Sequence, residues 1–244
     1  MFQPYAVCLD MRYYSGPMAT PDRQDMPPPI PVITLDGPAG SGKGTIAALL
    51  AERLGWWLLD SGAIYRVAAL AALHRQLVLD DEQALAALLE SLQIRFEQGR
   101  AFCNGEEVTA AIRTPACSDA TSRISALPAV RRGLLALQRS FRQAPGLVAD
   151  GRDMGTVVFP DAGLKVFLTA SPEVRAQRRL KQLSEQGIGA NLSGLVQDMR
   201  ARDERDANRA IAPLRPAADA VIINSDTLAP EQVLELILSR QREV

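Results

Sequence analysis

The sequence predicts an α/β protein in which helices cover both faces of a parallel β-sheet. From Pro31 onward, short apolar runs alternate with longer helical stretches, which is the pattern of repeated strand–helix–strand units. The runs are almost continuously hydrophobic, as expected for strands that are buried on both faces. A glycine-rich segment, GPAGSGKGT, joins the first run to the first helical stretch. The chain is therefore expected to fold around an open parallel sheet.

The expected elements follow from these runs in chain order. Strands are predicted at 32–35, 57–60, 147–149, 165–169 and 221–224. Helices are predicted at about 44–54, 62–74, 81–92, 128–142, 172–186, 192–208 and 230–241. Between 94 and 108 the pattern changes to two short strands around Gln98-Gly99 and Asn104-Gly105, and the second pair is a strong tight-turn signal. We expect a small antiparallel insertion here that runs to about Pro128.

The first 30 residues differ from the rest of the chain. They contain six prolines and little hydrophobic periodicity, and no basic stretch precedes an apolar one as in a signal peptide. We expect 1–30 to be a disordered or loosely attached extension before a domain that spans 31–244. Because Met11, Met18 and Met26 all precede the first strand, a later start codon is an alternative.

Composition limits the classes of function. The 244 residues carry a formal net charge of −1, whereas a surface for nucleic acid polymers is usually strongly basic. The aliphatic stretch at 67–73 is far shorter than the roughly 20 apolar residues that span a bilayer. Cys8, Cys103 and Cys117 suit neither a disulfide framework nor a zinc site, so we expect a reducing, cytoplasmic location. His74 is the only histidine, which leaves little material for histidine-based catalysis.

The glycine-rich segment at 37–45 predicts a phosphate-binding loop. Its glycines let successive backbone N–H groups point at one anion, and the following helix N-terminus adds partial positive charge. Lys43 is expected to reach the β and γ phosphates. Gly44 separates this lysine from the hydroxyl of Thr45, a form that resembles the nucleoside monophosphate kinases rather than GTPases. The expected phosphate contacts are Gly37, Pro38, Ala39, Gly40, Ser41, Gly42, Lys43, Gly44 and Thr45.

Three further polar clusters follow strands or lie on a helix. Residues 60–66 read DSGAIYR, which is also an ordinary helix start with Asp60 or Ser61 as the cap. Residues 149–162 read ADGRDMGTVVFPDA and follow a strand, where open α/β sheets bind ligands. On a helix, Arg202, Asp206 and Arg209 fall on one face, which by itself fits a solvated surface as well as a ligand site.

The loop and these clusters, with RDERDANRAIAPL at 202–214, are together very similar to the bacterial cytidylate kinase family from Pro31 to the C-terminus. The resemblance implies a Rossmann-like P-loop core with a five-stranded parallel sheet at 31–93 and 129–244. It also implies a monophosphate-binding insertion at about 94–128 and a mobile lid at about 178–192. The implied reaction is phosphoryl transfer from ATP to CMP or dCMP with Mg²⁺, by a monomer that uses small nucleotides, no nucleic acid polymer and no membrane.

The resemblance also assigns roles by position. Arg66, Arg152 and Arg209 look like the residues that hold the acceptor phosphate, and Arg202 and Asp206 look like ribose contacts. Ser122, Arg131 and Asp153 match the cytosine contacts, and Ser61 and Asp150 complete the expected substrate site. The expected catalytic residues are Lys43, Arg152, Arg178, Arg179 and Arg209, of which Arg178 and Arg179 resemble lid arginines. Because Mg²⁺ takes few protein ligands, Thr45 and Asp150 are its expected partners, directly or through water.

Three other functions are alternatives to this one. Another P-loop kinase acting on UMP, AMP or shikimate would lack the GRDMGT and RDxxDxxR pairing of this chain. A GTPase-type switch would carry an Asn-Lys-x-Asp motif, which the sequence does not contain. An inactive binding module would not need Lys43 together with the full set of arginines.

Overall fold

The computed structural model describes residues 29–97, 99–185 and 187–242. The predicted extension at 1–30 lies outside these ranges except for its last two residues, and so does Gln98 of the predicted insertion.

The centre of the protein is a five-stranded sheet in the order β2-β6-β1-β7-β8, with every neighbouring pair parallel. Its strands are β1 (Val32–Asp36), β2 (Trp57–Asp60), β6 (Leu147–Gly151), β7 (Leu164–Thr169) and β8 (Val221–Asn224). This confirms the predicted sheet, although β1 and β6 extend past their predicted ends and β7 begins one residue earlier. β1 lies between β6 and β7, the switch point beyond which α/β sheets bind ligands.

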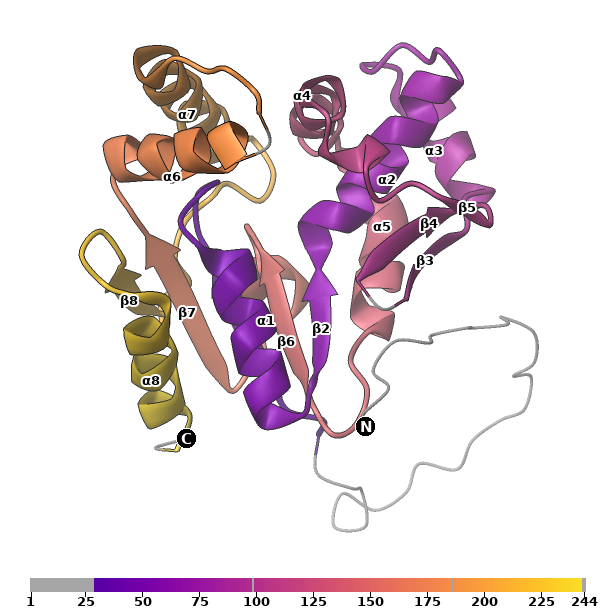
Figure 1. Ribbon diagram of the computed structural model, residues 1–244. Helices are drawn as coiled ribbons and strands as arrows, with labels where there is room; N and C mark the ends of the chain where they lie inside the picture. Colours follow the sequence, from indigo (N-terminus) through magenta and orange to yellow (C-terminus); the bar gives the residue numbers. More distant parts are fainter. Residues whose placement is uncertain (1–28, 98, 186, 243–244) are drawn as a thin grey trace, which may run out of the picture.

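Both faces of the sheet are covered by helices, as the apolar strands predict. All residues of β1 are buried, and its side chains alternate between two hydrophobic cores. α1 (Lys43–Leu54) and α8 (Pro230–Gln241) pack with Ile33 and Leu35 on one face. α2 (Ser61–His74) and α5 (Pro128–Ser140) pack with Val32 on the other. Figure 1 shows these layers.

The insertion is an antiparallel sheet of three strands, where the sequence predicted two. After α3 (Glu82–Glu90) come β3 (Ile94–Glu97), β4 (Arg100–Cys103) and β5 (Glu106–Glu107). The turn at Asn104 and Gly105 has positive φ at both residues, as the tight-turn signal indicates. It returns the chain so that Glu106 lies opposite Cys103, which creates the additional strand.

A helix that the sequence did not predict follows this sheet. After a 3₁₀ turn, η1 (Ala111–Arg113), the helix α4 (Pro115–Ile124) begins at a cap in which Cys117 donates its N–H to Thr114 Oγ1 at 3.3 Å. Pro115 occupies the first helical position, where its missing N–H costs nothing. α4 packs against α2 and carries the candidate residue Ser122.

The remaining helices stand beyond the carboxyl ends of the strands, where α6 (Pro172–Glu185) packs on α7 (Leu192–Ala207) (Figure 1). A five-residue π-helix, η2 (Met154–Val158), follows β6 and was not predicted. The predicted helices are otherwise confirmed, with ends that differ from the prediction by at most two residues. Among the described residues, no helix has both the length and the apolar character needed to cross a membrane.

Candidate active site

The glycine-rich loop joins β1 to α1, as predicted, and leaves the start of α1 open to an anion. Gly42 precedes Lys43, the first helical residue, with φ of 96°. No side chain among the described residues caps this helix, so its first N–H groups remain available. Gly37 has φ of 148°, and a Cβ there would lie 2.0 Å from the carbonyl oxygen of Leu168 on β7. The loop therefore depends on glycine both for its turn and for its contact with the sheet.

Lys43 is buried beside Asp150 at the carboxyl end of β6. Its Nζ donates to the carbonyl oxygen of Pro38 at 3.1 Å and lies 3.9 Å from Asp150 Oδ1. Burial, reinforced by the charge of Arg152, lowers the pKa of Lys43 to about 8. Burial also raises the pKa of Asp150 to about 6, against the attraction of Lys43. The ammonium group is thus held at the loop in a site that already favours added negative charge.

Thr45 and Asp150 both lie near the start of α1. Thr45 is exposed in the first turn of the helix. A Cβ on the intervening Gly44 would lie 3.4 Å from Asp150 Oδ2, so the carboxylate approaches the same helix start. A hydroxyl and a carboxylate next to a phosphate loop suit Mg²⁺, which keeps several waters and takes few protein ligands. The described residues contain no cluster of three or more side chains that could enclose a metal ion by themselves.

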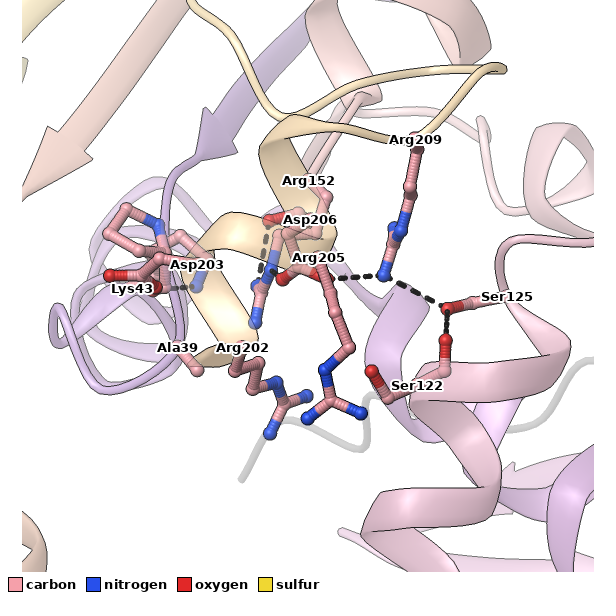
Figure 2. A network of polar contacts seen from close by, with 12 residues as sticks. Ala39, Lys43, Ser122, Ser125, Arg152, Arg202, Asp203, Arg205, Asp206 and Arg209 are labelled. Carbon is pink, nitrogen blue, oxygen red and sulfur yellow. Dashed lines mark hydrogen bonds and ion pairs between the residues drawn. The ribbon is translucent and has the colours of Figure 1, made fainter. Parts of the chain in front are cut away.

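A second cluster joins β6 to α7. Arg152 Nε donates to Asp206 Oδ2 at 3.1 Å, and Arg209 makes a short contact with Asp206 Oδ1 (Figure 2). Asp206 is 1% exposed, so these arginines compensate a buried charge. The prediction that Arg209 lies on the same helix face as Asp206 was wrong, because α7 ends at Ala207. The contact forms from the segment after the helix instead.

Arg202 lies one turn before Asp206 on α7. Its Nη1 donates to Ser118 Oγ on α4 at 3.4 Å, whereas its buried Nε has no partner among the described residues. Burial, with a contribution from Arg152, lowers the pKa of Arg202 to about 10. A buried donor without an acceptor is costly, so this side chain is suited to a ligand with a hydroxyl or carbonyl oxygen.

A third cluster lies beyond Arg209 and consists of a buried ion pair and two serines. Arg131 on α5 makes a short ion pair with Asp153, and the two side chains are 9% and 5% exposed. Arg131 also donates to the carbonyl oxygen of Ser125 at 3.2 Å, and Arg209 donates to Ser125 Oγ at 3.0 Å. Ser122 Oγ is buried without a partner in the described part of the chain. Figure 2 shows Ser125 on the far side of Arg209 from Lys43.

The start of α2 contributes two of the predicted residues. Asp60 is the helix cap, because its Oδ1 accepts the N–H of Ala63 at 2.9 Å. Ser61 instead donates its hydroxyl to Gln138 Oε1 on α5 at 3.0 Å. Arg66, further along α2, is half-buried, and its charge helps to lower the pKa of Asp150. The start of α2 therefore places Ser61 and Arg66 next to the Lys43–Asp150 pair and the cluster around Asp206.

The two predicted lid arginines both lie within α6. Arg178 donates to the carbonyl oxygen of Ser41 at 3.2 Å and to that of Ser225 at 2.6 Å. It therefore ties α6 to the phosphate loop and to the segment after β8. Arg179 is half-buried on the same helix. The structure therefore brings Arg178 to the phosphate loop.

Sequence reasoning missed a buried arginine beside the loop. Arg175 is 1% exposed and donates to the carbonyl oxygens of Ala39 at 3.0 Å and Ala170 at 2.9 Å. It also pairs bidentately with Asp203 on α7. Arg175 belongs to a charged helix in which several arginines follow one another, and nothing in that pattern distinguishes it from a solvated residue.

The fold and these clusters define a P-loop phosphotransferase, because they combine an open phosphate loop, a buried lysine and converging arginines that suit phosphate oxygens. The chain belongs to the cytidylate kinase family, whose sequence profile matches residues 33–243.

Alignments with similar proteins cover most of both chains. The chain is 56% identical over 214 residues to the cytidylate kinase of Marinomonas sp. (strain MWYL1), covering 86% of this chain and 94% of that protein. It is 57% identical over 208 residues to the cytidylate kinase of Bordetella bronchiseptica, covering 85% and 93%. Among solved structures, a shikimate kinase from Bacteroides thetaiotaomicron matches with 16% identity and a TM-score of 0.43, covering 87% and 96%.

Proposed function

We propose that this protein transfers the γ-phosphoryl group of ATP to CMP or dCMP, giving ADP and CDP or dCDP. The observation that carries the proposal is the order of the three clusters. Lys43 at the phosphate loop lies beside Asp150, and Arg152 and Arg209 meet on Asp206 in the second cluster. Arg209 and Arg131 both donate to Ser125, which links the second cluster to the Arg131–Asp153 pair. A donor phosphate, an acceptor phosphate and a polar base edge match these clusters in the same order.

On the donor side, the loop amides at 37–45 would hold the ATP phosphates. Lys43 neutralises charge that spreads over the moving phosphoryl group, and catalysis here requires alignment rather than covalent chemistry. Arg178 and Arg179 supply further positive charge from α6. Thr45 and Asp150 would hold Mg²⁺ directly or through water, and the ion would supply positive charge that offsets the charge of the phosphates.

On the acceptor side, Arg66, Arg152 and Arg209 would hold the phosphate of the monophosphate. Their planar guanidinium groups remain charged and meet phosphate oxygens bidentately. Asp206 keeps Arg152 and Arg209 together before substrate arrives. Arg202 and Asp206 would contact the ribose, consistent with the unpartnered Nε of Arg202. Ser61 and Asp150 complete this side of the site.

The base edge of cytosine suits the third cluster. Its N4 amine is a donor that Asp153 can accept, and Arg131 can donate to the N3 and O2 acceptors. The unpartnered hydroxyl of Ser122 supplies a further polar contact. Uracil instead presents O4 to the carboxylate, so two acceptors oppose each other and the buried charge loses a partner.

We further propose that the insertion at about 94–128 and a lid at about 178–192 close over both nucleotides and exclude water, which limits hydrolysis of ATP. The lid boundary coincides with the second half of α6 and the segment before α7. The enzyme is proposed to act as a cytoplasmic monomer on free nucleotides. Equal protease sensitivity of the lid with and without a bisubstrate analogue would contradict closure.

Phosphoryl transfer from ATP to a panel of AMP, CMP, dCMP, UMP and shikimate tests the function. CMP and dCMP should be the preferred acceptors, whereas a preference for AMP, UMP or shikimate would contradict the proposal. Lys43→Ala is the matched control, and its kcat should fall by orders of magnitude because the ammonium group acts mainly in the transition state. Turnover like that of the wild type in folded Lys43→Ala would contradict the phosphate-loop mechanism.

Asp153→Asn tests how the base is read. The variant should lose CMP activity, and its ratio of kcat/KM for CMP over UMP should fall, because an amide can donate to O4 of uracil. Sites built around such a hydrogen bond discriminate by as much as about 10⁴-fold in kcat/KM. The measurement is the ratio of kcat/KM for CMP over UMP in both proteins. An unchanged ratio would assign base reading to Ser122 and Arg131 alone.

A further inference from the structure

Asp36 is a buried carboxylate that none of the roles above uses. It is the last residue of β1, directly before the phosphate loop, and it is 5% exposed. Its Oδ1 accepts the N–H of Met154 at 2.8 Å, and its Oδ2 accepts the N–H of Gly155 at 2.8 Å. Each carboxylate oxygen therefore holds one backbone amide of η2, the segment that follows Arg152 and Asp153.

These two amides lie at the start of the π-helix, where N–H groups lack partners within the helix. Asp153 occupies the N-cap position of η2, and an aspartate there normally accepts such N–H groups itself. Asp153 makes no capping hydrogen bond within the described residues, and its carboxylate pairs with Arg131 instead. Asp36 thus caps η2 in place of Asp153, so the carboxylate of Asp153 can pair with Arg131 at the proposed base site.

Both ends of this contact are fixed by packing. The backbone next to Asp36 is held because Gly37 lies against the carbonyl oxygen of Leu168, where a Cβ would approach to 2.0 Å. A Cβ on Gly155 would lie 2.8 Å from Thr34 Oγ1 on the same strand as Asp36. Small shifts of η2 relative to β1 are therefore opposed on both sides.

We propose that Asp36 is a positioning residue for the acceptor: by holding the amides of Met154 and Gly155, it sets where Asp153 presents its carboxylate to the base. This rests on the proposed function of Asp153 in reading cytosine. Burial raises the pKa of Asp36 to about 7, with a further contribution from Asp153, and the two amides and Lys43 oppose this shift. The contact thus joins the donor loop to the base site across the sheet.

Asp36→Asn is the direct test, because the amide keeps the shape but can accept only one of the two N–H groups. Losing a hydrogen bond to a charged group shifts the equilibrium between the held and the released position of η2 by about tenfold or more. We expect KM for CMP to rise at least about tenfold and the CMP-over-UMP ratio of kcat/KM to fall, with KM for ATP within about twofold. Gly155→Ala should also raise KM for CMP and lower the CMP-over-UMP ratio, because it displaces the other end of the contact. If Asp36→Asn does not fold, the kinetics of Gly155→Ala test the proposal instead.

Asp81→Asn is a matched control. Asp81 also accepts two backbone N–H groups, from Gln83 at 3.1 Å and Ala84 at 3.0 Å, but these bonds cap α3 and do not hold a residue of the three clusters. This variant should leave all kinetic constants unchanged. An unchanged KM for CMP in Asp36→Asn would overturn the proposal. An equal rise of both KM values would also overturn it, because Asp36 would then act through Lys43.

Hydrogen exchange separates this inference from the proposed function. If the wild type does not phosphorylate CMP, the proposed function fails whatever the variants do. The exchange rates of the Met154 and Gly155 amides, measured in wild type and Asp36→Asn, still report the contact itself. At least about tenfold faster exchange in the variant supports the positioning role, and equal rates would overturn it.

Discussion

The pH dependence of ATP binding tests the environment of Lys43. Its Nζ is buried and its pKa is lowered to about 8, first by burial and then by the charge of Arg152. For a lysine with a lowered pKa, the charged form is lost as pH rises through that value. The protonated fraction therefore falls from about 0.9 at pH 7 to about 0.1 at pH 9. If the phosphates require the ammonium group, ATP affinity falls about tenfold over this range.

The assay is equilibrium binding of ATP without acceptor between pH 7 and 9, in wild type and in Lys43→Arg. A guanidinium group stays charged throughout, so the affinity of the variant should not change with pH. A parallel fall in both proteins, or none in the wild type, would refute the assignment of Lys43.

Three further predictions concern stability and the loop. Gly37→Ala should lower the free energy of unfolding, measured in urea, by more than about 3 kcal/mol, because its Cβ would lie 2.0 Å from the Leu168 carbonyl oxygen. Arg131→Met should cost about 3–5 kcal/mol by leaving Asp153 as a buried unpaired charge, and adding Asp153→Asn should restore part of it in a double-mutant cycle. Arg175→Met should raise KM for ATP because it releases the phosphate loop. Arg175→Lys should not restore this KM, since an ammonium group cannot form the bidentate contacts with Asp203. An unchanged KM for ATP would show that Arg175 serves stability alone.

The parallel sheet could be predicted because strands buried on both faces are apolar along their whole length. The insertion and the helix after it could be predicted only in part. The buried face of α4 is formed largely by small or polar residues such as Cys117, Ala120, Thr121 and Ser122. Such a face carries no aliphatic periodicity, so the pattern that identifies the other helices is missing.

The candidate site also could be predicted only in part. Residues at strand ends, such as Asp150 and Arg152, could be predicted because parallel strands bring their carboxyl ends to one edge of the sheet. The π-helix could not be predicted, because its first amides are satisfied by Asp36 from a distant part of the chain. The pairing of Arg131 with Asp153 likewise depends on how α5 packs against η2 rather than on local sequence.

The cations gathered at the proposed phosphate site explain how a chain with a net charge of −1 would bind several phosphates. Burial lowers the pKa values of Lys43, Arg202 and Arg209, and in each case Arg152 lowers the pKa further. The cations therefore repel one another before substrate binds, and a phosphate dianion among them relieves this repulsion. Because these side chains are buried, salt screens them less than it screens surface charges. The attraction is thus local to the site and does not require a basic protein surface.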